Sequence, residues 1–385
     1  LFLNRMIFST AMVDPVDFLA LQFIRKRLND LPGSDFFSSW DFTSDPCGFS
    51  GVYCDGDRVV ALNLGDPRAA SPGLMGRLDS AVGRLSALEE FTVVPGRIMG
   101  RLPSTLSELK NLKLFGVSRN YISGEIPPGL GSLPQLKTLD LSFNQLSGSI
   151  PPSLGTLPEI SNLVLSHNRL VGEIPPFSSQ TLVRLDLKHN QLSGWIPADG
   201  FPPSIRYLSL STNRLWGPVD RALSRLTNAN YIDLSTNHFS GGIPGAVFTF
   251  PIASLQLQRN QFTGEVRPET GRVTIPTVDL SFNGFSGEIP AAFSAVQILY
   301  LNNNKFTGQV PGSIVDRILS ADMEILYLQH NFLTGIHINP TVEIPVRTSM
   351  CLQYNCMVLP VDTPCPLNAG KQKARPLQQC TTSKG

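Results

Sequence analysis

The sequence lacks any long hydrophobic run. No apolar stretch approaches the roughly 20 residues that a helix needs to cross a bilayer, and the C-terminal end has no apolar tail of the kind that directs a lipid anchor. An excess of one charge is also missing, because 31 Lys and Arg residues stand against 30 Asp and Glu residues. We therefore expect neither membrane insertion of this chain nor a nucleic-acid partner.

Histidine and cysteine are both scarce. The 5 histidines are scattered along the chain, and no Ser/His/Asp or Cys/His order suggests a catalytic nucleophile. The glycines follow a regular spacing rather than forming a phosphate-binding loop. The 6 cysteines lie near the two ends, and their even number fits disulfides in an oxidising compartment. We expect a protein that is not an enzyme and that has no cofactor and no metal site.

What the chain has in abundance is one repeated segment. The stretch Leu136–Pro151 reads LxxLxLSxNxLSGxIP, and related segments recur from about Leu88 to about Ile336. Their asparagines are spaced 21 to 27 residues apart, at Asn120, Asn144, Asn168, Asn190, Asn213, Asn237, Asn260, Asn283, Asn304 and Asn331. A period in the twenties with LxLxxN inside it is the signature of leucine-rich repeats.

The repeat explains how the fold is built. In Leu139-Asp140-Leu141 apolar and polar residues alternate, which predicts a short strand with one buried face. One such strand cannot bury that face alone, but strands stacked at about 4.8 Å form a parallel sheet over a continuous core. We expect each repeat asparagine to bond backbone groups of its own and the adjacent coil. The expected fold is a leucine-rich repeat solenoid, a curved right-handed superhelix with a parallel concave β-sheet, about 11–12 repeats and disulfide-capped ends.

The segment N-x-L-S/T-G-x-I-P resembles that of the plant extracellular leucine-rich repeat proteins. This class includes receptor-kinase ectodomains, receptor-like proteins and polygalacturonase-inhibiting proteins. The resemblance covers the chain from about Asp14 to Cys380, and it includes the stretch Trp40–Cys54, which is similar to the family cap W…PCxWxGVxC but has Phe49 in place of a Trp. The resemblance implies a secreted, extracellular protein of the apoplast or cell wall.

These patterns divide the chain into four segments. Residues 1–13 are a candidate signal-peptide remnant, and residues 14–57 are an N-terminal cap whose helix begins at Asp14-Pro15. Residues 58–336 contain the leucine-rich repeats. Residues 337–385 form a C-terminal cysteine-containing cap and tail.

The cysteines are expected to close the two caps. We interpret Cys47 and Cys54 as one disulfide. The other four cysteines allow three pairings, and spacing alone does not choose among them. The resemblance to the family implies a short bridge from Cys356 to Cys365, which Cys351–Cys380 would complete.

The strand positions that point away from the core are the natural binding surface. Aromatic residues line up there from the middle to the C-terminal half of the chain, and aromatic and Arg side chains are typical interface anchors. Ring stacking would also suit a sugar, and ordinary surface aromatics are the structural alternative. The candidate binding residues on the concave face are Arg184, His189, Tyr207, Tyr231, Arg259, Phe282, Tyr300 and Tyr327.

Aspartates also recur at one repeat position, at Asp140, Asp186, Asp233 and Asp279. Asp is common at this position of the repeat, so a structural role is the simpler interpretation. Carboxylates on separate coils also lack the close pairing that a glycosidase needs.

We therefore expect a non-enzymatic recognition module that binds a peptide, protein or cell-wall fragment on its concave face. Its partner would be a protein or peptide ligand, a cell-wall polysaccharide or a hydrolase. The alternative is an inhibitor of a secreted cell-wall-degrading enzyme that resembles the polygalacturonase inhibitors, although those carry more cysteines in the N-terminal cap. An ice-binding surface would need a flat, regular array of Thr or Asn, which the sequence does not contain.

Overall fold

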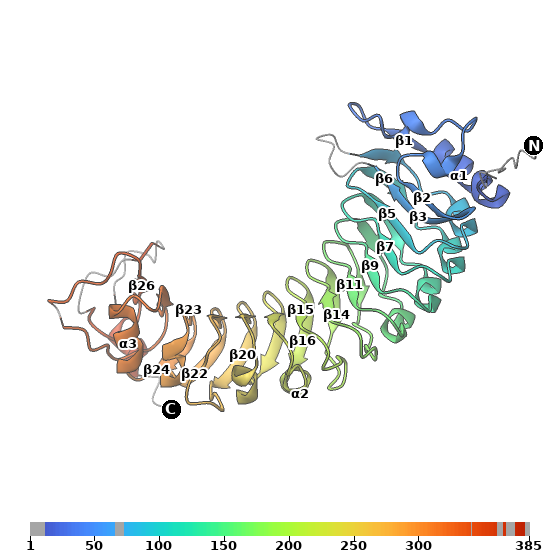
Figure 1. The fold of residues 1–385 in the computed structure, drawn as a ribbon. Coiled ribbons are helices and arrows are strands. Elements are labelled where there is room, and N and C mark those ends of the chain that lie inside the picture. Colours follow the sequence, from blue (N-terminus) through green and yellow to red (C-terminus); the bar gives the residue numbers. More distant parts are fainter. Residues whose placement is uncertain (1–11, 66–72, 340, 360–364, 367–373, 382–385) are drawn as a thin grey trace, which may run out of the picture. The chain divides into compact units, whose positions relative to one another are not determined.

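The computed structural model describes residues 12–65, 73–339, 341–359, 365–366 and 374–381. The chain divides into two compact units, Leu1–Val171 and Gly172–Gly385. Figure 1 shows the elements in chain order, with the short strands of successive coils stacked side by side within each unit. Of the predicted signal-peptide remnant at residues 1–13, residues 1–11 lie outside the described residues.

The first unit contains strands of two sheets. In the large sheet, the first two strands pair antiparallel and the rest pair parallel. Its strands are β2 (Val52–Asp55), β3 (Arg58–Leu64), β5 (Glu90–Val93), β7 (Leu114–Gly116), β9 (Thr138–Asp140) and β11 (Asn162–Val164). The second sheet contains β1 (Leu28–Asp30), β4 (Leu74–Gly76), β6 (Arg97–Gly100), β8 (Tyr121–Glu125) and β10 (Gln145–Ser147). The strand β12 (Val171–Gly172) follows in the sequence.

The second unit repeats this arrangement with parallel strands only. Its part of the large sheet contains β13 (Arg184–Asp186), β15 (Tyr207–Ser209), β17 (Tyr231–Asp233), β19 (Ser254–Gln256), β21 (Thr277–Asp279), β23 (Ile298–Tyr300), β25 (Ile325–Tyr327) and β26 (Ser349–Cys351). The second sheet of this unit is a separate sheet, and it contains β14 (Gln191–Gly194), β16 (Arg214–Pro218), β18 (His238–Gly241), β20 (Gln261–Glu265), β22 (Gly284–Glu288) and β24 (Lys305–Thr307).

Short helices complete the coils. Among the described residues, four are α-helical: α1 (Pro15–Arg27), α2 (Asp220–Ser224), α3 (Gly312–Leu319) and α4 (Leu377–Thr381). The rest are 3₁₀ helices: η1 (Phe36–Ser39), η2 (Pro46–Gly48), η3 (Ser80–Arg84), η4 (Ser104–Glu108), η5 (Pro128–Ser132), η6 (Pro152–Thr156), η7 (Gly245–Thr249) and η8 (Ala291–Ala295). From β3 to β25, the described residues contain five large-sheet strands in the first unit and seven in the second. Twelve coils agree with the predicted number of repeats.

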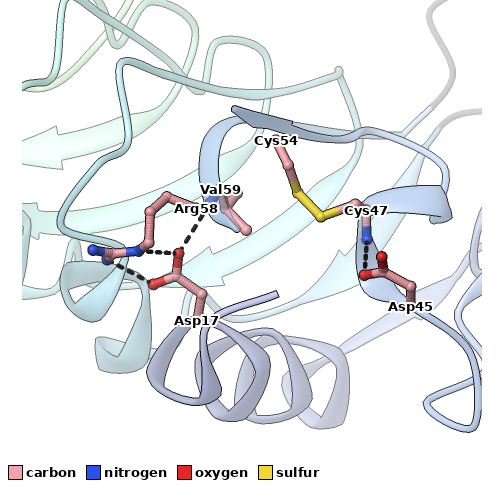
Figure 2. Close-up of a disulfide and its surroundings, with 6 residues drawn as sticks. All are labelled: Asp17, Asp45, Cys47, Cys54, Arg58 and Val59. Atoms are coloured by element: carbon pink, nitrogen blue, oxygen red, sulfur yellow. Dashed lines mark hydrogen bonds and ion pairs between the residues drawn. A yellow bond between two sulfur atoms is a disulfide. The ribbon is translucent and has the colours of Figure 1, made fainter. Parts of the chain in front are cut away.

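The N-terminal cap is closed by a capped helix and a buried ion pair. The Asp14 side chain accepts hydrogen bonds from the first backbone N–H groups of α1, as expected for a helix that begins at Asp14-Pro15. Figure 2 shows the carboxylate of Asp17, which is 0% exposed and accepts hydrogen bonds from Arg58 Nε at 3.0 Å and from the Val59 N–H at 2.9 Å. The predicted Cys47–Cys54 disulfide, drawn in the same figure, is confirmed.

The repeat asparagines connect neighbouring coils as predicted. Asn144 Nδ2 donates to the carbonyl of Val117 in the preceding coil and to those of Leu141 and Ser142 in its own coil. Its Oδ1 accepts from the N–H of Ile122 in the preceding coil. The corresponding bonds recur in the second unit at Asn213, Asn237, Asn260, Asn283, Asn304 and Asn331.

Apolar residues fill the core of each unit. In the second unit, phenylalanine takes the apolar position of successive second-sheet strands, and the rings of Phe239, Phe262 and Phe285 stack at centroid distances of 6.3 and 6.0 Å. All three rings are buried. Burial of apolar surface contributes about 25 cal/mol per Å², so every added coil stabilises its neighbours. The sheet strands are thereby held on a packed support.

The C-terminal cap contradicts one prediction. Its disulfides are Cys351–Cys365 and Cys356–Cys380, so the implied pairing of Cys356–Cys365 with Cys351–Cys380 is wrong. The reason is a long-range backbone contact, because the Arg375 N–H donates to the carbonyl of Asn355 at 2.9 Å. This bond brings the segment before α4 alongside Asn355, so Cys380 on α4 reaches the adjacent Cys356 and leaves Cys351 to Cys365.

The repeat geometry continues past Ile336, the end of the predicted repeat segment. The strand β26 pairs parallel with β25. Asn355 occupies the next ladder position, and its Nδ2 donates to the carbonyls of Leu328 and Leu352. The signal in the sequence is Met350-x-Leu352-x-x-Asn355, a form of LxLxxN with Met in place of the first Leu.

Candidate binding surface

The candidate residues lie on or beside the large sheet of the second unit. Each strand there has three residues, and each residue lies opposite the same position of the next strand, as Tyr207 lies opposite Tyr231. The middle residue of each strand is buried in the core. The first and third side chains therefore point to the other side of the sheet. We call the surface formed by these first and third positions from β13 to β25 the open face.

A stack of three side chains marks the open face at its first strand positions. The guanidinium carbon of Arg184 lies 4.1 Å from the ring centroid of Tyr207. The rings of Tyr207 and Tyr231 lie 4.7 Å apart and are nearly parallel, with an interplanar angle of 6°. Cation–π and aromatic contacts of this kind fix the orientation of side chains that are only half-buried. We call these three residues the Arg–Tyr stack.

Buried polar atoms lie beside the Arg–Tyr stack. Arg184 Nη2 lies 3.1 Å from Asp186 Oδ2, and Asp186 is 2% exposed. Among the described residues, the buried atoms Arg184 Nε and Asp186 Oδ1 have no hydrogen-bond partner. A buried polar atom without a partner costs about 1–3 kcal/mol.

The tyrosines of the stack are neutral over the physiological pH range. Burial, with a smaller contribution from the negative charge of Asp233, raises the pKa of Tyr231 to about 12. Burial, followed by the charge of Asp186, also raises the pKa of Tyr207. Both hydroxyl groups therefore remain able to donate and accept hydrogen bonds.

Tyr300 and Tyr327 form a separate pair. They occupy the third positions of β23 and β25, directly opposite each other, and their ring centroids lie 5.1 Å apart in an edge-to-face arrangement. Burial raises the pKa of both hydroxyl groups. Tyr327 is only 9% exposed, whereas Tyr300 is half-buried. The aromatics expected to line up as one series thus fall into different strand positions.

The other predicted residues lie in turns rather than in strands. His189, Arg259 and Phe282 each precede the repeat asparagine and have positive φ angles of 53°, 58° and 54°. The guanidinium carbon of Arg259 lies 4.5 Å from the ring centroid of Phe282. Because nearly every coil has a positive φ at this position, the conformation belongs to the repeat and does not by itself mark a site. The eight predicted residues therefore form three groups rather than one continuous row: the Arg–Tyr stack, the pair of Tyr300 and Tyr327, and the turn residues.

Three of the four recurring aspartates, Asp140, Asp233 and Asp279, bond to the turn that follows their strand. Asp233 Oδ1 accepts hydrogen bonds from the N–H and the hydroxyl group of Ser235, at 3.0 and 2.6 Å. Asp279 bonds to Ser281 in the same way, although burial raises the pKa of Asp279. These contacts support the structural interpretation of the aspartates.

Among the residues that the structure describes, no three His, Cys, Asp or Glu side chains lie close enough together to hold a metal ion. Within the same residues, every helix is too short or too polar to span a bilayer.

Sequence reasoning overlooked two exposed tryptophans, Trp195 and Trp216, on the second sheet. They are 58% and 52% exposed. The signal was available in the segment N-x-L-S/T-G-x-I-P, because Trp195 occupies the variable position after the Gly and Trp216 replaces the Ser or Thr before it. Arg206, directly before β15, is also exposed and lies next to Tyr207 in the sequence.

Comparisons with known proteins agree with this geometry. The family model "Leucine rich repeat N-terminal domain" matches residues 14–55, and leucine rich repeat models match residues 111–133, 134–179, 178–194 and 295–316. The chain is 33% identical over 165 residues to Receptor-like protein 18 of Arabidopsis thaliana. The chain is therefore a leucine-rich repeat protein that is similar to plant extracellular proteins of this class.

Two solved structures show the extent of the similarity. The crystal structure of PEPR1–AtPEP1 matches this leucine-rich repeat protein with a TM-score of 0.69 at 26% identity, over 89% of this chain and 52% of that chain. A plant ice-binding protein matches with a TM-score of 0.58 at 26% identity, over 87% of this chain and 99% of that chain. The match to Receptor-like protein 18 covers 41% of this chain and 19% of that protein.

Proposed function

We propose that this leucine-rich repeat protein is a non-enzymatic extracellular recognition module that binds a peptide or protein on the open face. The observation that carries the proposal is the Arg–Tyr stack, in which Arg184 lies over Tyr207 and Tyr207 lies on Tyr231. Arg and Tyr are enriched among the residues that dominate interface energies. Here they are ordered before any ligand binds, which lowers the entropy cost of binding.

The surroundings of the stack favour a polar, partly acidic ligand segment. Arg206 and Arg259 are exposed near the open face, whereas the carboxylates of Asp186 and Asp233 are buried. The accessible charge is therefore mainly positive, and it attracts a carboxylate group. The regular strand spacing suits an extended peptide that crosses several coils.

The similarity to receptors supports extracellular ligand binding. Related proteins include Receptor-like protein 18 and a TDR receptor, whose solved structure matches with a TM-score of 0.60 at 26% identity. All 6 cysteines are paired, which fits an oxidising compartment. A secreted protein and a membrane-anchored receptor-like protein would use the open face in the same way.

Two other functions lead to different expectations. Inhibition of a secreted cell-wall-degrading hydrolase, the alternative from the sequence, requires that binding abolish the activity of the hydrolase. Ice binding is the function of one structural relative. It finds little support here because Arg214, Trp216 and Lys305 interrupt the strands of the second sheet, where a regular Thr or Asn array is absent from the described residues.

The test is a selection of displayed plant secreted peptides and protein domains on the purified chain. Selected ligands are then titrated against the wild-type protein and a Tyr207→Ala/Tyr231→Ala variant. Loss of interface anchors costs about 2 kcal/mol or more, so we expect at least about tenfold weaker binding. The control is Tyr121→Ala, which removes a 51% exposed tyrosine from the second sheet. Ligands that bind the wild-type and double-variant proteins equally well would refute the proposal.

A further inference from the structure

Two of the three tryptophans are exposed on adjacent coils. Trp40 is buried in the N-terminal cap, and its Nε1 donates to the Ser50 carbonyl at 3.0 Å. Trp195 directly follows β14 and Trp216 lies in β16, and these two strands pair side by side (Figure 1). Their ring centroids lie 6.4 Å apart, and the ring planes are inclined by 32°. Both indoles are more than half exposed, so folding does not require their full burial.

A groove borders this tryptophan pair. Its volume is about 690 Å³, and Trp195, Pro197 and Pro218 contribute apolar walls to it. Asp220 and Arg221, at the start of α2, provide the charged groups of the lining. The pair and the groove therefore form one continuous surface on the second sheet, built from different residues than the open face.

We propose that Trp195, Trp216 and the adjoining groove form a binding site for a neutral oligosaccharide of pyranose units. One face of a pyranose ring presents C–H groups. When these groups pack on an indole ring, apolar surface of both partners is removed from water. Further units of the oligosaccharide enter the groove, where their hydroxyl groups contact the charged side chains.

The separation of the two indoles determines how a ligand binds. Carbon atoms in contact lie about 3.5–4.0 Å apart, so a ring held between two aromatic walls needs a gap of about 7–8 Å. The centroid distance of 6.4 Å is smaller than this gap. A ligand therefore lies across the two indoles rather than between them. A sugar ring can bind in this way, whereas a proline ring that needs an aromatic wall on each side cannot.

The polar groups of the groove also favour a sugar. Both side chains are exposed, and among the described residues neither Asp220 nor Arg221 has a side-chain hydrogen bond or ion pair. The carboxylate accepts hydrogen bonds and the guanidinium donates them, which matches hydroxyl groups that do both. A proline-rich segment lacks N–H donors, so it would leave Asp220 without a partner. The opposite charges also cancel, which favours a neutral glycan over a polyanion.

The experiment is a calorimetric titration of the whole chain with cellohexaose and mannohexaose, two neutral hexasaccharides. We expect binding of at least one of them, and at least tenfold weaker binding by Trp195→Ala and by Trp216→Ala. Tyr121→Ala and Tyr207→Ala/Tyr231→Ala serve as controls, and both should retain the wild-type affinity. Retention by the second control separates this site from the open face, so failure of one proposal is distinguishable from failure of the other.

A second measurement needs no variant. Hydroxyl-radical footprinting of the wild-type chain should show reduced oxidation of Trp195 and Trp216 when the bound hexasaccharide is present. Three results would overturn the proposal: no binding of either hexasaccharide, unchanged affinity and unchanged oxidation, or preferential binding of a polyproline peptide or an oligogalacturonate.

Discussion

At the scale of single residues, the repeat asparagine holds together backbone that has no strand partner. Asn144 is 8% exposed and bonds to three carbonyls and one N–H. The three carbonyls follow strands β7 and β9, and the N–H belongs to Ile122 in β8. Without the asparagine these buried groups would each lose a hydrogen-bond partner. The asparagine thus acts through polar atoms, and no apolar residue of similar size can replace it.

Replacement of this asparagine should therefore be costly. We expect Asn144→Ala to lower the free energy of unfolding by about 2–4 kcal/mol, because several buried groups lose partners at about 1–3 kcal/mol each. The adjacent Gln145→Ala is the control, with an expected change within about 0.5 kcal/mol. Denaturant unfolding followed by circular dichroism measures both. Equal midpoints for the two variants would contradict the role assigned to Asn144.

The tyrosines of the Arg–Tyr stack should be visible in an alkaline titration. The pKa of Tyr231 is raised to about 12, first by burial. The folded state therefore binds this proton more tightly than the unfolded state, whose tyrosine pKa is about 10. The resulting stability is present below about pH 10 and is lost as the pH rises toward 12.

The measurement is the ultraviolet absorbance of ionised tyrosine as a function of pH. We expect Tyr231→Phe to remove one of the last steps of this titration. A late step that is unchanged in the Tyr231→Phe variant would show that the stack does not shelter Tyr231.

At the scale of elements, each end of the solenoid is closed by contacts that do not follow the repeat. Helix α1 is joined to β3 by Asp17, whose carboxylate accepts from Arg58 and from a backbone N–H. At the other end, Arg375 donates from Nε to the carbonyl of Asn331 and lies 4.0 Å from the ring centroid of Phe332. These contacts cover apolar residues that an additional coil would otherwise bury.

The N-terminal contact can be tested by a change of charge alone. Asp17→Asn leaves Arg58 without its ionic partner, and breaking a buried pair costs up to about 3–5 kcal/mol. The Arg58 side chain is 33% exposed, so we expect a smaller loss, of about 2 kcal/mol. The control is Glu265→Gln, which breaks an exposed pair with Arg267 and should change stability by less than about 1 kcal/mol. Thermal unfolding that is unaffected by Asp17→Asn would contradict the closing role of this pair.

The sequence predicts the repeated strands, but it does not predict the disulfides of the C-terminal cap. The strands and the asparagine ladder repeat with the sequence period, so Leu139 or Asn144 could be placed from a local pattern. The pairing of the C-terminal cysteines could not be predicted in this way. It depends on the backbone hydrogen bond from Arg375 to Asn355, two residues that are far apart in the sequence. No local spacing contains that information.

At the scale of the whole molecule, the candidate site was only partly predictable. The outward positions followed from the strand pattern, but grouping the aromatics required counting each one back from its repeat asparagine. Tyr207 and Tyr231 share one position, Tyr300 and Tyr327 share another, and Phe282 lies in the turn. Which of these rings touch depends on side-chain packing, which a repeat pattern does not encode. The exposure of Trp195 was likewise a property of the folded surface.

The central claim is that the Arg–Tyr stack contacts the ligand. The most direct test is hydroxyl-radical footprinting of the chain with and without the peptide or protein obtained by selection. We predict that Tyr207 and Tyr231 become less reactive in the complex, while the exposed Tyr53 and Tyr121 oxidise at the same rate in both samples. Equal oxidation of Tyr207 and Tyr231 with and without the ligand would contradict the proposed function.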